Sequence, residues 1–196
     1  MKNKDTVSYE FESRAMIDEV TYQKMLTIYC KEKCKHLKIT NIYFDYVNKS
    51  LSRSHIVLRV RNINDKFDEL TLKIKEEKGD IEVTHQLTST EKNNLLNNIV
   101  FPSCKVKEEL LKRKVDLTKL KIVAILKTDR LEIEYEDHLF VLDKNHYNGI
   151  TDYNVEVEST SRNAAKKWLI KYISPFGIEY KKDYISKSRR ALNSAK

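Results

Sequence analysis

The sequence contains very little glycine. Among its 196 residues there are three glycines, Gly79, Gly149 and Gly177. Phosphate-binding loops of the Rossmann and P-loop types need clustered glycines, because their backbone must approach the phosphate groups closely. Neither a GxGxxG nor a GxxxxGK[ST] pattern occurs. If this protein binds phosphates, we therefore expect it to bind them with side chains.

Long hydrophobic runs and paired cysteines are also missing. We find no 18-residue apolar stretch and no signal-peptide pattern, so we expect a cytoplasmic protein without membrane contact. The three cysteines form no CxxC motif, and Cys30 and Cys34 are one helical turn apart, which favours reduced thiols. Cys104 has no base near it in the sequence, which argues against a thiol nucleophile. The five histidines lack a spacing such as HExxH, and we interpret them as structural or surface residues.

The charge balance is basic. Lysine and arginine outnumber the acidic residues by 37 to 29, a net charge of +8. Such a protein prefers polyanionic partners. The lysine-rich segments 105–121 and 181–196 suit nucleic acid by charge alone, but no pattern of stacking aromatic residues accompanies them. We therefore expect these segments to be solvated surface, with no nucleic-acid partner.

The hydrophobic pattern predicts an α+β protein with about eight strands. Strands are expected near residues 8–14, 36–47, 56–61, 70–75, 81–87, 121–135, 138–147 and 150–158. Helices are expected at 17–34 and 91–99 and after Ser161, which can cap a helix. Successive hairpins of this number can close into an antiparallel barrel with the helices outside. We expect one domain over residues 1–196, with 1–7 and 190–196 frayed, as a monomer or homodimer.

Charged residues alternate with spacers in the expected strands. In Glu10-Phe11-Glu12-Ser13-Arg14, the three charged side chains share one face if the segment is a strand. Two-residue turns at Glu136-Asp137 and Asn148-Gly149 place a second set on one face. That set is Arg130, Glu132, Glu134, Asp143, Glu156 and Glu158.

A basic set is expected on the earlier hairpins. A turn at Lys78-Gly79 pairs Lys75 with Glu82 and places Lys73 beside Thr84. Arg59 and Arg61 share that face if the loop before the next strand has an odd number of residues, such as 64–66.

Two interpretations of these charged faces remain open. They are either solvated faces with ion-pair ladders, or the walls of an ionic cavity. Buried cations need compensating charge, which a polyphosphate supplies. Clustered carboxylates tolerate that polyphosphate if a divalent cation lies between them, and Mg²⁺ or Mn²⁺ prefers such oxygen ligands.

The ordered set of motifs resembles the CYTH family of triphosphate tunnel metalloenzymes. Glu10-x-Glu12-x-Arg14 is similar to the ExExK signature of that family, with arginine in place of lysine. Further similar segments are Tyr43-Phe44-Asp45, Leu58-Arg59-Val60-Arg61, Thr71-Leu72-Lys73, Thr128-Asp129-Arg130, Leu142-Asp143 and Glu156-Val157-Glu158. Lys187 is the best candidate for a C-terminal lysine, and Lys181 and Lys182 compete with it. The resemblance covers about residues 8–190.

The resemblance implies a closed eight-stranded tunnel and a set of site residues. It implies metal binding by Glu10, Glu12, Asp143, Glu156 and Glu158. It implies triphosphate binding by Arg14, Arg59, Arg61, Lys73, Lys75, Arg130 and Lys187. Catalytic roles are expected for Glu10, Glu12, Lys73, Glu82 and Arg130.

Three functions are compatible with this reading. The first is metal-dependent hydrolysis of a triphosphate compound, with inorganic triphosphate ahead of nucleoside and thiamine triphosphates. The second is a class IV-type adenylyl cyclase, which makes cyclic AMP from ATP. The third is a non-enzymatic protein that binds polyphosphate or nucleotides. The sequence does not decide between them, because the same charges serve all three.

Overall fold

The computed structural model describes residues 4–29, 34–77, 79–181 and 185–195. In this part of the chain there are nine strands. They are β1 (Asp5–Glu10), β2 (Glu12–Ile17), β3 (Lys35–Asp45), β4 (Ile56–Ile63), β5 (Phe67–Ile74), β6 (Asp80–Gln86), β7 (Lys121–Glu134), β8 (His138–Tyr147) and β9 (Ile150–Ser159). The α-helices are α1 (Glu19–Tyr29), α2 (Ser50–Arg53), α3 (Ser89–Asn98), α4 (Lys105–Lys112), α5 (Arg162–Ile173) and α6 (Lys187–Ser194). Cys30 and Lys182 lie outside the described residues.

The α+β class is confirmed, but the strand count of eight is wrong. The expected strand at 8–14 is two strands, because the chain leaves strand geometry at Phe11. Hydrogen bonds join the strands in the order β1-β6-β5-β4-β3-β7-β8-β9-β2. The sheet is therefore open, with β1 and β2 as its edge strands, whereas we predicted a closed sheet. Near the two ends of the chain, β1 begins at Asp5 and α6 continues to Ser194; the expected fraying of residues 1–7 and 190–196 stays a prediction.

The described chain divides into two compact units. Unit 1 contains residues 1–9, 40–126 and 188–196, and unit 2 contains residues 10–39 and 127–187. The single domain that we expected over residues 1–196 stays a prediction. No helix in the described residues is long and apolar enough to span a membrane.

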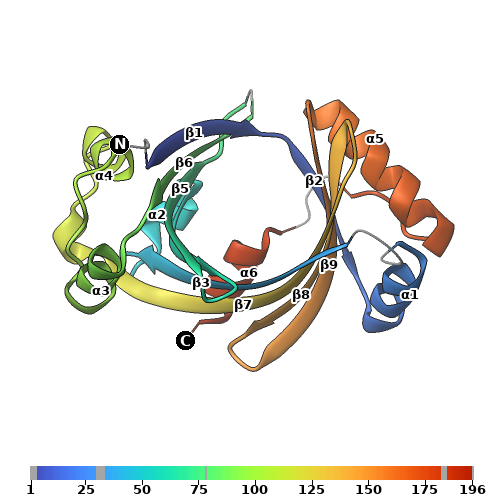
Figure 1. Cartoon of the computed structure of the whole chain (residues 1–196), viewed down its shortest axis with the longest axis horizontal. Helices are drawn as coiled ribbons and strands as arrows, with labels where there is room; N and C mark the ends of the chain where they lie inside the picture. Colours follow the sequence, from blue (N-terminus) through green and yellow to red (C-terminus); the bar gives the residue numbers. More distant parts are fainter. Residues whose placement is uncertain (1–3, 30–33, 78, 182–184, 196) are drawn as a thin grey trace. The chain divides into compact units, whose positions relative to one another are not determined.

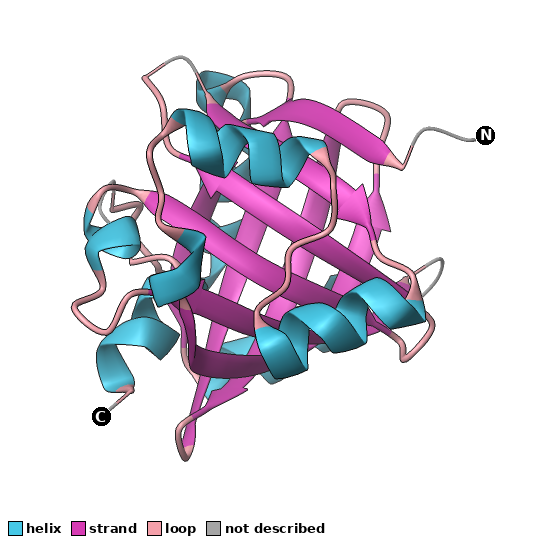
Figure 2. Cartoon of the chain, turned by 90° about the vertical axis from the view of Figure 1, so that its left-hand side faces the viewer, coloured by secondary structure: helices cyan, strands magenta, loops and turns pink. Residues whose placement is uncertain are grey.

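The hydrophobic core of unit 1 covers one face of its strands. In the β4–β5 ladder, Leu58 pairs with Leu72 and Val60 with Leu70, and these four side chains belong to one buried cluster. Leu95 of α3 and Leu110 of α4 belong to the same cluster. Figure 2 shows helices lying across the strands on this side. Because strand side chains alternate, the residues between the core residues face the other way.

Unit 2 is arranged in the same manner. Its core includes Leu142 and Phe140 of β8, Val155 of β9, and Leu169 and Ile173 of α5. In Figure 1, α5 runs beside β2 and β9, and α1 lies on the same side of these strands. The face opposite this core therefore carries the alternate residues of β2, β7, β8 and β9.

Turn residues set the register of the hairpins. Asn148 and Gly149 have φ values of 48° and 76°, which suit a two-residue hairpin, and Asp143 pairs with Asn154 as predicted. The loop 64–66 has three residues, so Arg59 pairs with Thr71 and lies on the face of Lys73 as predicted. The expected pairing of Lys75 with Glu82 is wrong. Lys73 pairs with Glu82 instead, because β5 ends at Ile74 and a wider turn connects it to β6.

Candidate functional site

The face of unit 2 opposite its core is lined by charged side chains. The ladders pair Arg130 with Asp143, Arg14 with Glu156 and Glu12 with Glu158. Two of the carboxylates are almost fully buried, since Asp143 is 0% and Glu156 2% exposed. The structure therefore brings together most of the acidic residues that the sequence predicted for this face.

Arg130 is the central cation of this face. Its Nε atom donates to Asp143 Oδ1 at 2.8 Å, and its Nη2 atom donates to Asp143 Oδ2 at 2.9 Å. Nη2 also contacts Glu156 Oε2 at 3.3 Å, and Nη1 lies 3.5 Å from Glu132 Oε1. The paired contacts with Asp143 match the planar geometry of guanidinium and carboxylate. Arg130 is thereby fixed in one orientation.

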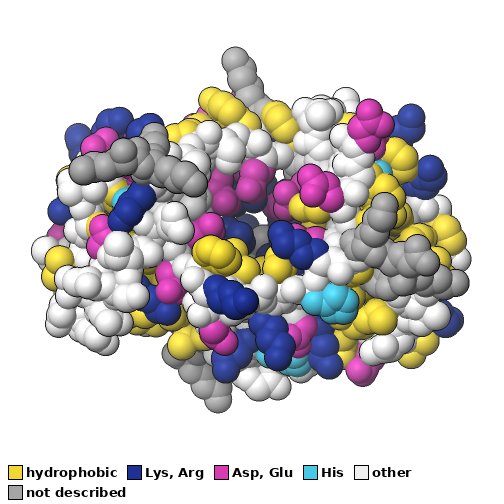
Figure 3. Space-filling view, in the orientation of Figure 1, with side chains coloured by type: hydrophobic (Ala, Val, Ile, Leu, Met, Phe, Trp, Pro, Cys, Tyr) yellow, Lys and Arg dark blue, Asp and Glu magenta, His cyan; other side chains and the backbone are white. Residues whose placement is uncertain are grey.

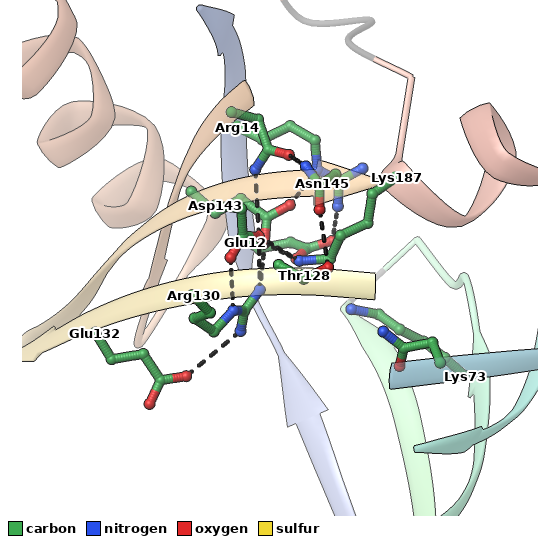
Figure 4. A network of polar contacts seen from close by, with 12 residues as sticks. Glu12, Arg14, Lys73, Thr128, Arg130, Glu132, Asp143, Asn145 and Lys187 are labelled. Atoms are coloured by element: carbon green, nitrogen blue, oxygen red, sulfur yellow. Dashed lines mark hydrogen bonds and ion pairs between the residues drawn. The ribbon is translucent and has the colours of Figure 1, made fainter. Parts of the chain in front are cut away.

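Lys187 reaches the same two carboxylates. Its Nζ atom lies 2.6 Å from Asp143 Oδ2 and 3.0 Å from Glu156 Oε2. Figure 4 shows Lys187 and Arg130 converging on Asp143. Of the competing lysines, Lys181 is exposed, and Lys182 is outside the described residues. Lys187 is therefore the described C-terminal lysine that contacts the acidic cluster.

These contacts control the charge of the buried carboxylates. Burial by itself raises the pKa of Asp143, but the neighbouring Arg130 and Lys187 outweigh burial and hold it below its ordinary value. Burial likewise raises the pKa of Glu156, while Lys187, Arg14 and Arg130 lower it further than burial raises it. Burial lowers the pKa of Arg130, but Asp143 and Glu156 raise it well above its ordinary value. All three groups are therefore charged at neutral pH.

Glu10 and Glu12, the two carboxylates of the N-terminal motif, come from β1 and β2. Arg14 forms an ion pair with Glu12, and its Nε atom lies 3.4 Å from Glu156 Oε1. Glu12 and Glu158 lie directly opposite each other on neighbouring strands, an arrangement that is unfavourable for two like charges. Glu10 is the last residue of β1, before the break at Phe11.

A group of uncharged polar residues adjoins the charges, and our sequence analysis did not identify it as part of the site. Asn145 donates to Asn154 Oδ1 at 2.8 Å and accepts from the Thr128 hydroxyl at 2.9 Å. All three are buried. Each lies two residues from a predicted site residue on its strand, so the strand period could have revealed them. These three residues extend the polar face along β7, β8 and β9 beyond the charged residues.

The acidic cluster fits a divalent cation. Mg²⁺ and Mn²⁺ prefer oxygen ligands, and several carboxylates lie on one face here. Glu156 Oε1 is buried and has no hydrogen-bond partner in the described part of the chain, although the Arg14 guanidinium is 3.4 Å away. The opposed pair of Glu12 and Glu158 also gains from an additional cation. The residues present therefore suit the metal that the sequence predicts.

Unit 1 carries a separate polar face. Arg59 is 7% exposed, and its Nη2 atom lies 3.3 Å from Glu82 Oε2. Its Nε atom is buried and finds no hydrogen-bond partner among the described residues. The same holds for the hydroxyl of Thr71, the residue with which Arg59 pairs. Buried polar groups without partners are uncommon in proteins and mark places where a ligand can bind. This face suits an anion that accepts from a guanidinium and a hydroxyl.

The other three cations predicted in unit 1 have surroundings different from those of Arg59. Arg61 donates to Asn41 Oδ1 at 3.2 Å, and Lys73 lies 3.9 Å from Asp80 Oδ2. Lys75 follows β5 and is exposed, with its backbone N–H donating to His55. Its expected role in binding triphosphate stays a prediction.

The Tyr43-Phe44-Asp45 segment has a local structural role. Asp45 is 1% exposed, and its carboxylate accepts from the backbone N–H groups of Leu51 and Ser52 at 2.9 Å and 3.0 Å. These bonds satisfy donors at the start of the short helix α2.

A family model of the CYTH domain matches residues 8–191, which is nearly the whole chain. The chain belongs to the CYTH domain family. The resemblance seen in the sequence is thus confirmed. The protein named "Putative triphosphatase YjbK" from Bacillus subtilis is 30% identical over 172 residues, which cover 82% of this chain and 87% of that protein.

Two solved structures support the same placement. A chain from Bacillus halodurans described as a putative adenylate cyclase is 26% identical, with a TM-score of 0.84 over 94% of this chain and 97% of that chain. The Hippeastrum protein HpAC1, described as having a dominant triphosphatase activity, is 18% identical, with a TM-score of 0.76 over 94% of this chain and 95% of its own. This second likeness supports the fold alone.

Proposed function

We propose that this CYTH protein is a divalent-metal-dependent hydrolase of triphosphate compounds, with inorganic triphosphate as its leading substrate. The observation that carries the proposal is the buried pair of Asp143 and Glu156, which stays ionised among three cations and leaves Glu156 Oε1 without a hydrogen-bond partner. The name of the 30% identical Bacillus subtilis relative points to the same activity.

The proposal assigns metal binding to carboxylates of unit 2. Asp143, Glu156, Glu12 and Glu158 are the proposed ligands, with Glu10 as a further carboxylate from the sequence motif. A bound Mg²⁺ or Mn²⁺ supplies charge neutralisation at the phosphate oxygens and acidifies a water molecule. Lys187 contacts two of these carboxylates, so a metal ion that binds them competes with its ammonium group.

Phosphate binding is assigned to cations of each unit. Arg130 and Arg14 are oriented by the carboxylates that they contact, so they hold positive charge in fixed places. Arg59 has an unused Nε donor beside the unused Thr71 hydroxyl. Groups of this kind stabilise the charge on a transferring phosphoryl group without reorganising during the reaction. Arg61, Lys73, Lys75 and Lys187 complete the proposed set, and Glu82 positions Arg59.

The two strands that end the pairing order, β1 and β2, are separated in sequence only by Phe11. Membership of the CYTH family supports a tunnel fold by homology, and we propose that this fold binds the triphosphate.

The experiment compares products from several substrates. Purified protein is incubated with Mg²⁺ or Mn²⁺ and with tripolyphosphate, ATP or thiamine triphosphate, and released orthophosphate is measured. We expect the highest kcat/KM with tripolyphosphate and no release in the presence of EDTA. Metal-independent release, or none from any of the three substrates, contradicts the proposal.

An adenylyl cyclase is the second candidate, favoured by the 26% identical Bacillus halodurans chain described as a putative adenylate cyclase. The same incubation with ATP separates the two. A cyclase yields cyclic AMP and pyrophosphate in equal amounts, whereas a triphosphatase yields orthophosphate. Cyclic AMP as the main product replaces our proposal with this second one.

A further inference from the structure

A second group of metal-binding side chains lies in unit 1, away from its polar face. Asp5 of β1, His85 of β6 and Cys104 before α4 each offer a ligand atom, and these atoms all lie within 4.8 Å of one another. His85 pairs with Leu70 in the β5–β6 ladder, so it points to the helix-covered core side. The cluster is therefore distinct from the carboxylates proposed for catalysis.

The histidine at the centre of this group has one unused nitrogen. Its side chain is 5% exposed, and its Nδ1 atom lies 2.8 Å from Asp5 Oδ1. Among the residues that the structure describes, the buried Nε2 atom has no hydrogen-bond partner, and Glu91 Oε1 is 3.7 Å from it. A buried ring nitrogen without a partner costs free energy unless a ligand uses it. A carboxylate on Nδ1 also orients an imidazole for metal binding through Nε2.

The donor set identifies the class of metal. Thiolate, imidazole and carboxylate together suit Zn²⁺ and similar transition metals, whereas Mg²⁺ and Mn²⁺ prefer oxygen ligands alone. Zinc bonds of about 2.0–2.3 Å place tetrahedral ligand atoms roughly 3.3–3.8 Å apart. The separation of 3.7 Å between His85 Nε2 and Glu91 Oε1 falls in this range. The 4.8 Å limit on the other pairs requires only a small contraction.

We propose that His85 Nε2, Cys104 and Glu91 Oε1 form a structural binding site for Zn²⁺, with Asp5 orienting the imidazole through its hydrogen bond to Nδ1. Burial raises the pKa of the Cys104 thiol, so the metal-free thiol is protonated, and metal binding releases this proton to solvent. The bound ion joins β6 to the start of α4. Through the hydrogen bond between Asp5 and His85 Nδ1, it also fixes β1 at the end of the strand order.

Cobalt substitution tests the proposal directly. Tag-free, metal-free protein is titrated with Co²⁺, whose bond to a thiolate gives a charge-transfer absorption that oxygen ligands do not give. We expect this band to saturate at one equivalent and to disappear when Zn²⁺ is added. Cys104→Ser removes the band, whereas the double variant Cys30→Ser, Cys34→Ser retains it. No band in the parent, or a band that persists in Cys104→Ser, overturns the proposal.

A competition assay measures the contribution of the other ligands. Zn²⁺ affinity is determined against a chromophoric chelator for the parent, His85→Gln and Asp5→Asn, each shown to be folded by circular dichroism. We expect the dissociation constant to rise at least about tenfold in each variant, as for loss of a ligand or of its orienting partner. An unchanged constant in both variants contradicts the site.

The same assay separates this inference from the proposed function. Glu156→Gln lies in unit 2 and alters the carboxylates proposed for hydrolysis. We expect it to leave the cobalt band and the Zn²⁺ affinity unchanged. If Glu156→Gln removes the band, the cobalt ion bound by the thiolate also depends on the carboxylates of unit 2. The inference of a separate Zn²⁺ site then fails, while the proposed function stands.

Discussion

Arg130 illustrates how a buried charge depends on its partners. It contacts Asp143 through two nitrogens and Glu156 through one, and all three side chains are at most 7% exposed. Removing one partner from a buried ion pair leaves an uncompensated charge, which costs far more than the pair itself contributes. We therefore expect Arg130 to contribute to the stability of the fold as well as to the proposed catalysis.

We predict that Arg130→Met lowers the free energy of unfolding by about 3–5 kcal/mol, because Asp143 and Glu156 then keep only Lys187 and Arg14 as compensating cations. Urea denaturation followed by circular dichroism measures the change. The control is Lys127→Met on the same strand, which removes an exposed cation and is expected to stay within about 0.5 kcal/mol of the parent. Equal effects of the two changes contradict this reading.

The lowered pKa values of Asp143 and Glu156 predict acid sensitivity. Their folded-state pKa lies below the unfolded value, so their contribution is complete above about pH 4 and is lost as pH falls through the folded pKa. We expect the unfolding free energy of the metal-free protein to decrease below about pH 4. The decrease is smaller in Asp143→Asn, which lacks one titrating group.

The measurement is a series of urea unfolding curves between pH 6 and pH 2.5 in the presence of a chelator. Asp129→Asn, which removes an exposed carboxylate, serves as the control and is expected to follow the parent. A steeper acid dependence in Asp143→Asn than in the parent is the outcome that the account does not allow.

At the level of single residues, the alternation of charge was sufficient to predict the main cluster. Arg130, Asp143 and Glu156 meet as expected, since short turns fix their register. The contact of Lys187 could not be derived from local pattern, because it depends on how a distant C-terminal segment packs. The group of Asp5, His85 and Cys104 was missed for the same reason, since its members are far apart in sequence.

Helix caps show how local signals act at the scale of elements. Ser161 precedes α5, and its hydroxyl accepts from the backbone N–H of Ala164 at 3.2 Å. We predict that Ser161→Ala lowers the unfolding free energy by about 1 kcal/mol, because one N-terminal donor of the helix loses its partner. Thermal and urea unfolding provide the measurement. Thr160→Ala, at the exposed neighbouring position, is expected to change stability by less than half as much, and a larger effect there argues against capping.

The pairing of β2 with β9 carries a cost that a metal can remove. Glu12 and Glu158 are direct partners in this ladder, and like charges at such positions are unfavourable. We predict that Glu158→Gln raises the unfolding free energy of metal-free protein by about 0.2–1 kcal/mol and weakens Mn²⁺ binding. Urea unfolding and calorimetric titration measure the two effects. Glu134→Gln, on an exposed position of β7, is the control; a loss of stability in Glu158→Gln contradicts the prediction.

Strand boundaries were the least predictable feature of the elements. The pattern predicted one strand over 8–14, but the chain changes partners at Phe11, and β2 pairs with β9. A period-two pattern cannot reveal such a change, because the side chains alternate in the same way on both sides of the break. The register of Lys73 against Glu82 was missed for a related reason, since glycine marks a turn without fixing its length.

At the scale of the whole molecule, the excess of positive charge is not the feature that defines the site. On the face shown in Figure 3, lysine and arginine side chains lie among acidic ones. The distinctive charges are those with little exposure, Arg59 in unit 1 and Arg130, Asp143 and Glu156 in unit 2. In unit 2 a divalent metal would compensate Asp143 and Glu156, and this fit is why we connect the CYTH family membership with the proposed hydrolysis.

The most direct test of the account is the dependence of tripolyphosphate hydrolysis on Mn²⁺ concentration in the parent and in Glu156→Gln. The account predicts metal-dependent release of orthophosphate by the parent and a kcat/KM at least about 100-fold lower in Glu156→Gln, since a proposed metal ligand is lost. Glu134→Gln is expected to match the parent, and circular dichroism confirms that each variant is folded. Parent-like hydrolysis by folded Glu156→Gln at every Mn²⁺ concentration contradicts the account.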